Sequence, residues 1–475
     1  MSDNYDLVIV GMGSGGMVAA EFAATLDLNV AIVERHRVGG DCLWTGCVPS
    51  KSILAAGKVA HHFRTANRYG IAAVEPQIDR KAVWSAVRAV QHSIAATDDD
   101  PDRFAALGIT VIMGHATVSG PTSVNVALND GGSIALKTRF ILLATGSRPV
   151  EPDISGLADA GYITSESLFE LNDPPASFVN IGGGPIAVEM VQAFTRLAIP
   201  TVLLTRDTRI LPRDEPTLVE SLVESLEAEG VELEFGVTIE RVTVENGKKV
   251  VHGSQRGEPH RWEADEILVA VGRAPNVEGL GLEAAGVETN ERGNVIVDER
   301  MRTTVPTIYA CGDLAGRFLF THSASYEGVR AVRDMFFPGK GKVTAGIPWC
   351  TFTDPELAHA GLTEAEARAK YGNNVVVWKQ DLAHNDRART DRVDRGAIVV
   401  ITHKSRVVGA HILAPSAGEI IHEFALAIEQ GMKLSDLSGF VHVYPTIGTA
   451  IAQMAGEAAF ETAKKLGWLV RRSRH

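Results

Sequence analysis

The sequence predicts an α/β fold that consists of two Rossmann-like dinucleotide-binding domains followed by a C-terminal α+β domain. Three observations indicate this fold. A strand, a glycine turn and a helix follow one another twice along the chain, and glycine turns become rarer after about residue 344. The 475 residues are also too many for one hydrophobic core. At roughly 100–200 residues per domain, the chain has room for about three domains.

The first dinucleotide-binding pattern lies near the N-terminus. Residues 6–10 form a buried-strand pattern, and Gly11, Gly13 and Gly16 follow it before an alanine-rich helical stretch. The first glycine makes the turn, the second lets backbone N–H groups approach a pyrophosphate, and the third keeps helix and strand close together. A second predicted strand ends at Glu34, whose carboxylate suits ribose hydroxyls.

The same pattern recurs in the middle of the chain. The predicted strand 177–181 leads into Gly182, Gly184 and Ala187, and a second strand is predicted over 201–204. Each unit therefore has the strand–turn–helix–strand order that dinucleotide binding requires.

The end of the second strand in this unit bears on the choice of nicotinamide donor. NAD-binding enzymes usually place Asp or Glu there to bind the ribose 2′-hydroxyl. This chain has Thr205 followed by Arg206, with Arg209 nearby. Because a guanidinium pairs well with a 2′-phosphate, we expect NADPH as the donor. Asp207 would repel that phosphate, so NADH stays open as an alternative.

Composition excludes several other classes of function. The net charge of −12 argues against nucleic acid as a partner. No signal peptide precedes the first strand and no run of roughly 18 apolar residues occurs, so we expect a cytoplasmic protein without a membrane span. Four cysteines in so long a chain do not form a disulfide scaffold.

The most informative segment, residues 39–51, carries Cys42 and Cys47 just before a helix predicted over 53–60. Backbone N–H groups at a helix N-terminus stabilise a thiolate, and such a pair can cycle between dithiol and disulfide. The alternatives are that the two cysteines are small buried hydrophobic residues or that they form half of a zinc site. No second cysteine–histidine cluster completes a zinc site, so we expect no bound metal.

The spacing GG-x-C-x4-C-x-P-x-K resembles the class I pyridine nucleotide–disulfide oxidoreductases, the flavoprotein disulfide reductases that include dihydrolipoamide dehydrogenase, glutathione reductase and mercuric reductase. Further segments resemble this family's motifs in the same order: residues 144–146, 271–276, 308–313 and 352–356. The resemblance covers nearly the whole chain.

The resemblance implies FAD, NAD(P)H and a set of residues for each. The FAD set is Gly11, Gly13, Gly16, Glu34, Gly40, Lys51, Thr145, Gly146, Gly312, Asp313 and His322. Within it, Asp313 would bind the ribityl chain, and a helix beginning near His322 would face the pyrimidine end of the flavin. The NAD(P)H set is Gly182, Gly184, Ala187, Arg206, Arg209 and Gly272.

The resemblance also assigns the redox roles. Cys47 would lie against the flavin as the charge-transfer thiol, and Cys42 would face the acceptor as the interchange thiol. Lys51 and Glu189 match a family ion pair near the reactive flavin nitrogen. The remaining cysteines, Cys311 and Cys350, match no redox role, and we expect both to be small core residues.

The chain departs from the family near its C-terminus. Tyr444 stands where disulfide-exchanging members have their acid–base histidine, and Thr449 stands where they have the glutamate that orients it. A tyrosine with a pKa near 10 is a poor proton acceptor at neutral pH. His442 is a second candidate base, and a structural or surface histidine is the alternative. Tyrosine at this place and the loop around Arg387 resemble mercuric reductase.

Two features expected of an efficient mercuric reductase are missing from the sequence. The chain ends in residues 470–475 without a cysteine pair, and no small metal-binding module precedes the first strand. The expected acceptor is therefore a soft metal ion or another thiol-reactive molecule. A dihydrolipoamide dehydrogenase with an altered acid–base site is the alternative, and a non-catalytic flavoprotein subunit is a minor one.

The resemblance gives the expected domain organisation and a homodimer in which each active site borrows residues from the other subunit. The expected boundaries are 1–155 and 275–343 for FAD binding, 156–274 for NAD(P)H binding and 344–475 for dimerisation.

Overall fold

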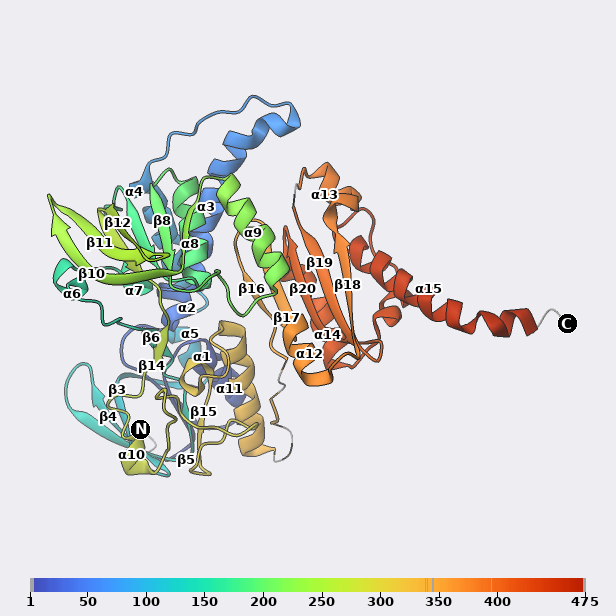
Figure 1. Ribbon diagram of the computed structural model, residues 1–475. Coiled ribbons are helices and arrows are strands. Elements are labelled where there is room, and N and C mark those ends of the chain that lie inside the picture. The colour runs from blue at the N-terminus through green and yellow to red at the C-terminus, as the bar shows by residue number, and fades with distance from the viewer. Residues whose placement is uncertain (1–3, 338, 340, 344–345, 394, 473–475) are drawn as a thin grey trace.

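The computed structural model describes residues 4–337, 339, 341–343, 346–393 and 395–472. Three large sheets organise this part of the chain (Figure 1). The first lies at the lower left of the view, the second above it and the third on the right. The predicted α/β class, with two glycine-turn units and a C-terminal α+β region, is confirmed.

The first sheet contains the first glycine-turn unit. Its parallel strands run in the order β3-β2-β1-β5-β15, and β4 pairs antiparallel with both β3 and β5. Apolar runs buried on both faces explain the parallel arrangement, since helices cover the sheet. Its strands are β1 Asn4–Val10, β2 Val30–Glu34, β3 Thr110–Gly120, β4 Ser123–Leu128, β5 Ser133–Leu143 and β15 Ile308–Ala310.

Two helices pack against each other beside this sheet, α1 (Ser14–Ala24) and α11 (Thr321–Phe336). A Cβ on Gly328 would lie 2.6 Å from the carbonyl oxygen of Gly15. Only glycine therefore permits this close approach, which fixes the start of α11 next to the first glycine turn.

The second sheet is parallel, in the order β13-β7-β8-β9, and contains the second glycine-turn unit. Its strands are β7 Phe178–Ile181, β8 Thr201–Thr205, β9 Glu232–Phe235 and β13 Glu266–Val269, with the helices α8 Pro185–Arg196 and α9 Pro216–Ala228. An antiparallel sheet follows it, β10 Val237–Glu245, β11 Lys248–Gln255 and β12 Glu258–Ala264. A short pair, β6 (Ser147–Pro149) and β14 (Arg273–Pro275), lies where the chain leaves the first region and returns to it.

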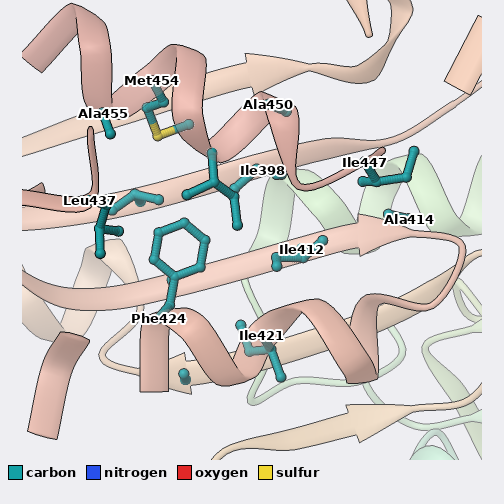
Figure 2. Packing of buried hydrophobic residues seen from close by; sticks show 14 of the residues in the cluster. Ile398, Ile412, Ala414, Ile421, Phe424, Leu437, Ile447, Ala450, Met454 and Ala455 are labelled. Carbon is teal, nitrogen blue, oxygen red and sulfur yellow. The ribbon is translucent and has the colours of Figure 1, made fainter. Parts of the chain in front are cut away.

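The third sheet is antiparallel, in the order β16-β17-β20-β19-β18. Its strands are β16 Trp349–Thr351, β17 Glu356–Gly361, β18 Val375–Asp381, β19 Ala397–His403 and β20 Arg406–Ala414. Phe424 of α14 (Ala417–Glu429) packs between Ile398 and Ile412 of the sheet and Met454 of α15 (Figure 2). The long helix α15 (Thr449–Arg472) continues beyond the sheet (Figure 1).

The remaining helices are shorter or connect these regions. They are α2 Gly40–Trp44, α3 Cys47–Thr65, α4 Arg80–Ala95, α5 Pro101–Ala106, α6 Leu157–Ala160, α7 Ser165–Leu168, α10 Leu282–Ala285, α12 Glu364–Tyr371 and α13 Asp386–Thr390. In the part of the chain described, no helix is both long and apolar enough to cross a bilayer.

One predicted helix boundary is wrong in a way that matters for the chemistry. The helix predicted over 53–60 begins at Cys47 and runs to Thr65. Pro49 obscured its start, but a proline is tolerated in the first turn because N–H groups there have no partner within the helix. The cysteine is therefore the first residue of the helix instead of preceding it.

We predict that Phe424→Ala lowers the free energy of local unfolding in the third sheet by about 3–5 kcal/mol, because it empties a fully buried site. Hydrogen exchange of the β19 and β20 amides measures this change, since a chain with several cores has no single unfolding free energy. His422→Ala, at an exposed position of the same helix, is the control and should change it by less than about 0.5 kcal/mol. Equal exchange in the two variants would contradict this packing.

Candidate active site

A cavity of about 1920 Å³ joins the two glycine turns, the two cysteines and the edge strand β16. Most of the predicted site residues line it: Gly11, Gly13, Glu34, Gly40, Cys42, Cys47, Lys51, Thr145, Gly146, Gly182, Gly184, Glu189, Arg206, Gly272, Gly312, Asp313 and His322. Five predicted residues do not: Gly16, Ala187, Arg209, His442 and Tyr444. The sequence motifs thus converge on one continuous space.

The two glycine turns have matching geometry. Gly11 has a φ of 102°, and a Cβ there would collide with the carbonyl oxygen of Ala144. Gly182 has a φ of 137°, and a Cβ there would collide with the carbonyl oxygen of Ala270. Gly16 packs its helix onto the Gly11 carbonyl, which explains why it lies outside the cavity. We call each turn, together with the start of the helix that follows it, a cradle. A pyrophosphate can approach the backbone at such a helix N-terminus, which fits two dinucleotides.

Two carboxylates border the first cradle. Glu34 accepts hydrogen bonds from the backbone N–H of Met12 at 2.8 Å and of His36 at 2.7 Å, which fix its side chain at the end of β2. Asp313 accepts a hydrogen bond from the Ser147 hydroxyl and lies 3.5 Å from Nε of Arg273. Both acidic groups are thus held in place beside the space that FAD would fill, which suits the hydroxyl groups of its ribose and ribityl chain.

Cys47 lies where two helices begin. It is the first residue of α3, and its Sγ lies 3.2 Å from Oγ1 of Thr321, the first residue of α11. A hydrogen bond from Cys42 lowers the pKa of Cys47, and the Thr321 hydroxyl and the Lys51 charge lower it further. The same interaction raises the pKa of Cys42. The geometry therefore favours the Cys47 thiolate with a protonated Cys42.

An ion pair lies beside the cysteines. Lys51 Nζ is 2.9 Å from Glu189 Oε2, and the glutamate side chain is only 4% exposed. The other carboxylate oxygen accepts the Phe352 backbone N–H at 2.9 Å. The Lys51 ammonium also lies 4.4 Å from the centre of the Phe352 ring. This network links α3, the second glycine-turn helix and the residue that follows β16 around the Lys51 ammonium group.

The predicted nicotinamide-donor residues differ in position. Arg206 is exposed and borders the cavity directly after β8. Arg209 donates to the Pro212 carbonyl oxygen at 2.8 Å and does not line the cavity. Of the two arginines, Arg206 is therefore the one placed to meet a bound nucleotide.

Neither candidate acid–base residue reaches the cysteines of its own chain. Tyr444 is 69% exposed and its hydroxyl donates to Asp386 at 2.9 Å, which raises the pKa of the tyrosine. His442 has a side chain that is 8% exposed, and its Nε2 lies 3.2 Å from Glu423. Asp386 and Glu423 were not singled out from the sequence, because each partner lies on another element of the fold.

The two cysteines predicted to be core residues differ in burial. Cys311 is buried, and burial raises the pKa of its thiol. Both cysteines line part of the cavity, but Cys350 is only partly buried, so the prediction is wrong for this residue. The reason is that β16 is an edge strand, and one side of it borders the cavity instead of a sheet neighbour. Burial nevertheless raises the pKa of the Cys350 thiol.

We predict that Thr321→Val raises the pKa of Cys47 by about one unit, because the thiolate loses one hydrogen bond. The measurement is the pH dependence of Cys47 alkylation in the reduced protein, followed by mass spectrometry. Thr321→Ser keeps the hydroxyl and is the matched control. An unchanged alkylation profile in Thr321→Val would show that the hydroxyl does not stabilise the thiolate.

Comparisons with known proteins agree with this geometry. The family model for the pyridine nucleotide-disulphide oxidoreductases matches residues 5–328, and the model for the dimerisation domain of that family matches residues 347–455.

Similar proteins carry several different names. The chain is 33% identical to a mercuric reductase of Streptomyces lividans, with 97% of each chain covered. It is 32% identical to a dihydrolipoyl dehydrogenase of Halobacterium salinarum, covering 96% of this chain and 97% of the relative. It is 34% identical to a glutathione reductase of Burkholderia cepacia, covering 94% of this chain and 97% of the relative.

A solved structure is also similar, the Cu(II) complex of the HOCl-induced flavoprotein disulfide reductase RclA from Escherichia coli. Its TM-score is 0.83 at 25% sequence identity, with 95% of this chain and 99% of that chain covered. Because the family models and the relatives span nearly the whole chain, the protein belongs to the pyridine nucleotide-disulphide oxidoreductase family of FAD-dependent enzymes.

Proposed function

We propose that this enzyme passes electrons from NADPH through FAD and the Cys42–Cys47 pair to a soft metal ion or another thiol-reactive acceptor. The observation that carries the proposal is the pair itself, since a stabilised thiolate and its protonated partner open into the cavity that both dinucleotide cradles share.

The first cradle and its two fixed carboxylates would hold FAD, with the expected FAD-binding residues along one side of the cavity. FAD supplies the hydride-accepting ring, which is chemistry that no side chain offers. The second cradle would hold the donor, with Arg206 at the 2′-phosphate. Lys51, held in place by Glu189, would direct its ammonium group toward the region between the two cradles where negative charge develops during reduction.

The roles of the two thiols follow from their acidities. Cys47, the more acidic, would remain a thiolate against the flavin. Cys42 would lose its proton when it attacks or binds an acceptor. Its higher pKa makes the resulting thiolate the stronger nucleophile of the two. Oxidation of the Cys47 thiolate and the Cys42 thiol to a disulfide releases two electrons, which pass to the acceptor, and one proton.

The residue at the acid–base position favours a metal ion as the acceptor. Asp386 raises the pKa of Tyr444, so this tyrosine stays protonated and does not replace a histidine base. Binding of a soft cation to two thiolates needs no proton delivery to a leaving thiol. The relatives named mercuric reductase and the Cu(II) complex of RclA support this choice.

A dihydrolipoamide dehydrogenase with an altered acid–base site is the second candidate. The observation that favours it is the pair formed by His442 and Glu423, 3.2 Å apart. This is a histidine–carboxylate arrangement two positions before Tyr444, which stands at the family's histidine position. Relatives named dihydrolipoyl dehydrogenase support it as well.

We also propose that the enzyme works as a homodimer, because the C-terminal region matches the family's dimerisation domain. Three strongly exposed apolar residues in that region, Val441, Val443 and Phe460, fit an interface with a second copy. The domain boundaries 1–155, 156–274, 275–343 and 344–475 remain part of the same proposal.

We predict that the enzyme oxidises NADPH with Hg(II) or Cu(II) at least about 100-fold faster than with lipoamide or glutathione disulfide, because loss of an acid–base histidine costs about that factor. Anaerobic absorbance at the NADPH band measures both rates. Cys42→Ser and Cys47→Ser should retain FAD and lose turnover of every acceptor. Faster turnover of lipoamide than of either metal ion favours the second candidate, and full activity in both variants excludes the thiols as the electron path.

We predict that Arg206→Ala lowers kcat/KM for NADPH about 10- to 150-fold, the effect of losing a charge-assisted phosphate contact of about 1.5–3 kcal/mol. The value for NADH should stay within about two-fold, because NADH has no 2′-phosphate. Arg209→Ala is the matched comparison and should have a smaller effect, since this arginine already binds the Pro212 carbonyl. A wild-type preference for NADH would reverse the assignment of the donor.

A further inference from the structure

Trp349 is a large aromatic residue that has no role in the two cradles or the cysteine pair as described so far. It begins β16 and lines the cavity. Its ring is stacked between Phe320, with ring centres 5.9 Å apart, and His359, with ring centres 3.5 Å apart. The planes are nearly parallel, at 14° and 12°. Stacking against two rings restricts the indole to one orientation.

A buried carboxylate holds the N–H edge of the indole. The Trp349 indole N–H donates to Oδ1 of Asp214 at 2.9 Å, and Asp214 is only 4% exposed. The Arg213 guanidinium lies 5.0 Å from the centre of the indole ring. Burial raises the pKa of Asp214 to about 6. A buried carboxyl is costly unless it is hydrogen-bonded, so this contact is a fixed feature of the site.

The loop that carries Asp214 also touches the second cradle. It joins β8 to α9, and the Leu211 N–H donates to the Gly183 carbonyl oxygen in the glycine turn at 2.8 Å. Leu211, Arg213 and Asp214 all line the cavity, as does Arg206 at the start of the same loop. One short segment therefore runs from the nucleotide turn to the indole.

The other side of Trp349 is tied to the redox centre. The carbonyl oxygen of Pro348 lies 2.7 Å from Nε2 of His322, the second residue of α11. Directly after β16, Phe352 donates its N–H to Glu189. The indole thus lies in the wall of the cavity between the second cradle and the helix whose first residue contacts Cys47.

We propose that Trp349, held by Asp214, is a positioning residue that sets the nicotinamide ring of the donor at its reacting distance from the flavin. This inference rests on the proposed function, because it concerns the hydride-transfer step. The indole is only partly buried, so the part of it that lines the cavity wall would contact the nicotinamide end of the donor at a fixed position. Small misplacements of a reacting ring have large effects on rate. The segment from the glycine turn to Asp214 couples this surface to occupation of the nucleotide site.

The neighbouring carboxylate provides a matched control. Glu215 is as buried as Asp214, at 4% exposure, and it accepts the Glu364 N–H at 3.1 Å. Its side chain links the same loop to the start of α12, but Glu215 does not line the cavity. Glu215→Ala therefore tests whether merely weakening the anchorage of the loop affects the reaction.

The experiment is anaerobic stopped-flow reduction of the FAD-loaded enzyme by NADPH, which separates the limiting reduction rate from the dissociation constant of the donor. Trp349→Phe keeps a ring in the stack and removes the N–H donor, and Asp214→Ala removes the acceptor. We expect each to lower the limiting rate about 10-fold, and the double variant to be no slower than either, because both remove the same hydrogen bond. The dissociation constant and FAD content should stay within about two-fold of wild type.

Two results would overturn the proposal: limiting rates within about two-fold of wild type in Trp349→Phe, or an equal loss in Glu215→Ala. Tryptophan emission gives a second readout that needs no catalysis. Binding of NADP⁺ should change the emission of wild type and of Glu215→Ala but not of Trp349→Phe, and an unchanged wild-type emission contradicts the placement. If neither NADPH nor NADH reduces wild type, the proposed function fails instead, and the emission result still tests the position of Trp349.

Discussion

The Cys47 sulfur lies at the start of two helices, and most of the active site is arranged around the negative charge that this position favours. The first turn of α3 offers N–H groups without partners in the helix, and Thr321 at the start of α11 adds a hydroxyl 3.2 Å away. Lys51 contributes a positive charge one turn further along α3, and Glu189 holds that charge in place. Removing the Thr321 hydroxyl or the Lys51 charge would shift the proton back toward Cys47.

The fold brings these supports together from distant parts of the chain. The close packing of α1 on α11 through Gly15 and Gly328 fixes Thr321 beside the first cradle. The second glycine-turn helix places Glu189 against both α3 and Phe352, the residue after β16. A donor bound in one cradle and a flavin bound in the other would therefore meet where the thiolate is held, without any large movement of the three sheets.

The sequence predicted the parts of this site that are local. Glycine turns and the spacing of Cys42 and Cys47 have short-range patterns with a physical cause, and all of the predicted FAD-binding residues except Gly16 line the cavity. The contacts of Thr321 with Cys47 and of Asp214 with Trp349 join residues more than 100 positions apart, so no local pattern predicts them. Cys350 was mistaken for a core residue because an edge strand reads like any other apolar strand in sequence.

The most direct test of this account is to find which thiols the donor makes reactive. The FAD-loaded enzyme, first oxidised, is alkylated with iodoacetamide before and after anaerobic addition of one equivalent of NADPH, and each cysteine is quantified by mass spectrometry. The account predicts that NADPH makes Cys42 and Cys47 reactive while labelling of Cys311 and Cys350 stays unchanged, because only the first two thiols change their redox state. Labelling of Cys42 and Cys47 that is equal with and without the donor, or a donor-dependent gain at Cys350 alone, would contradict it.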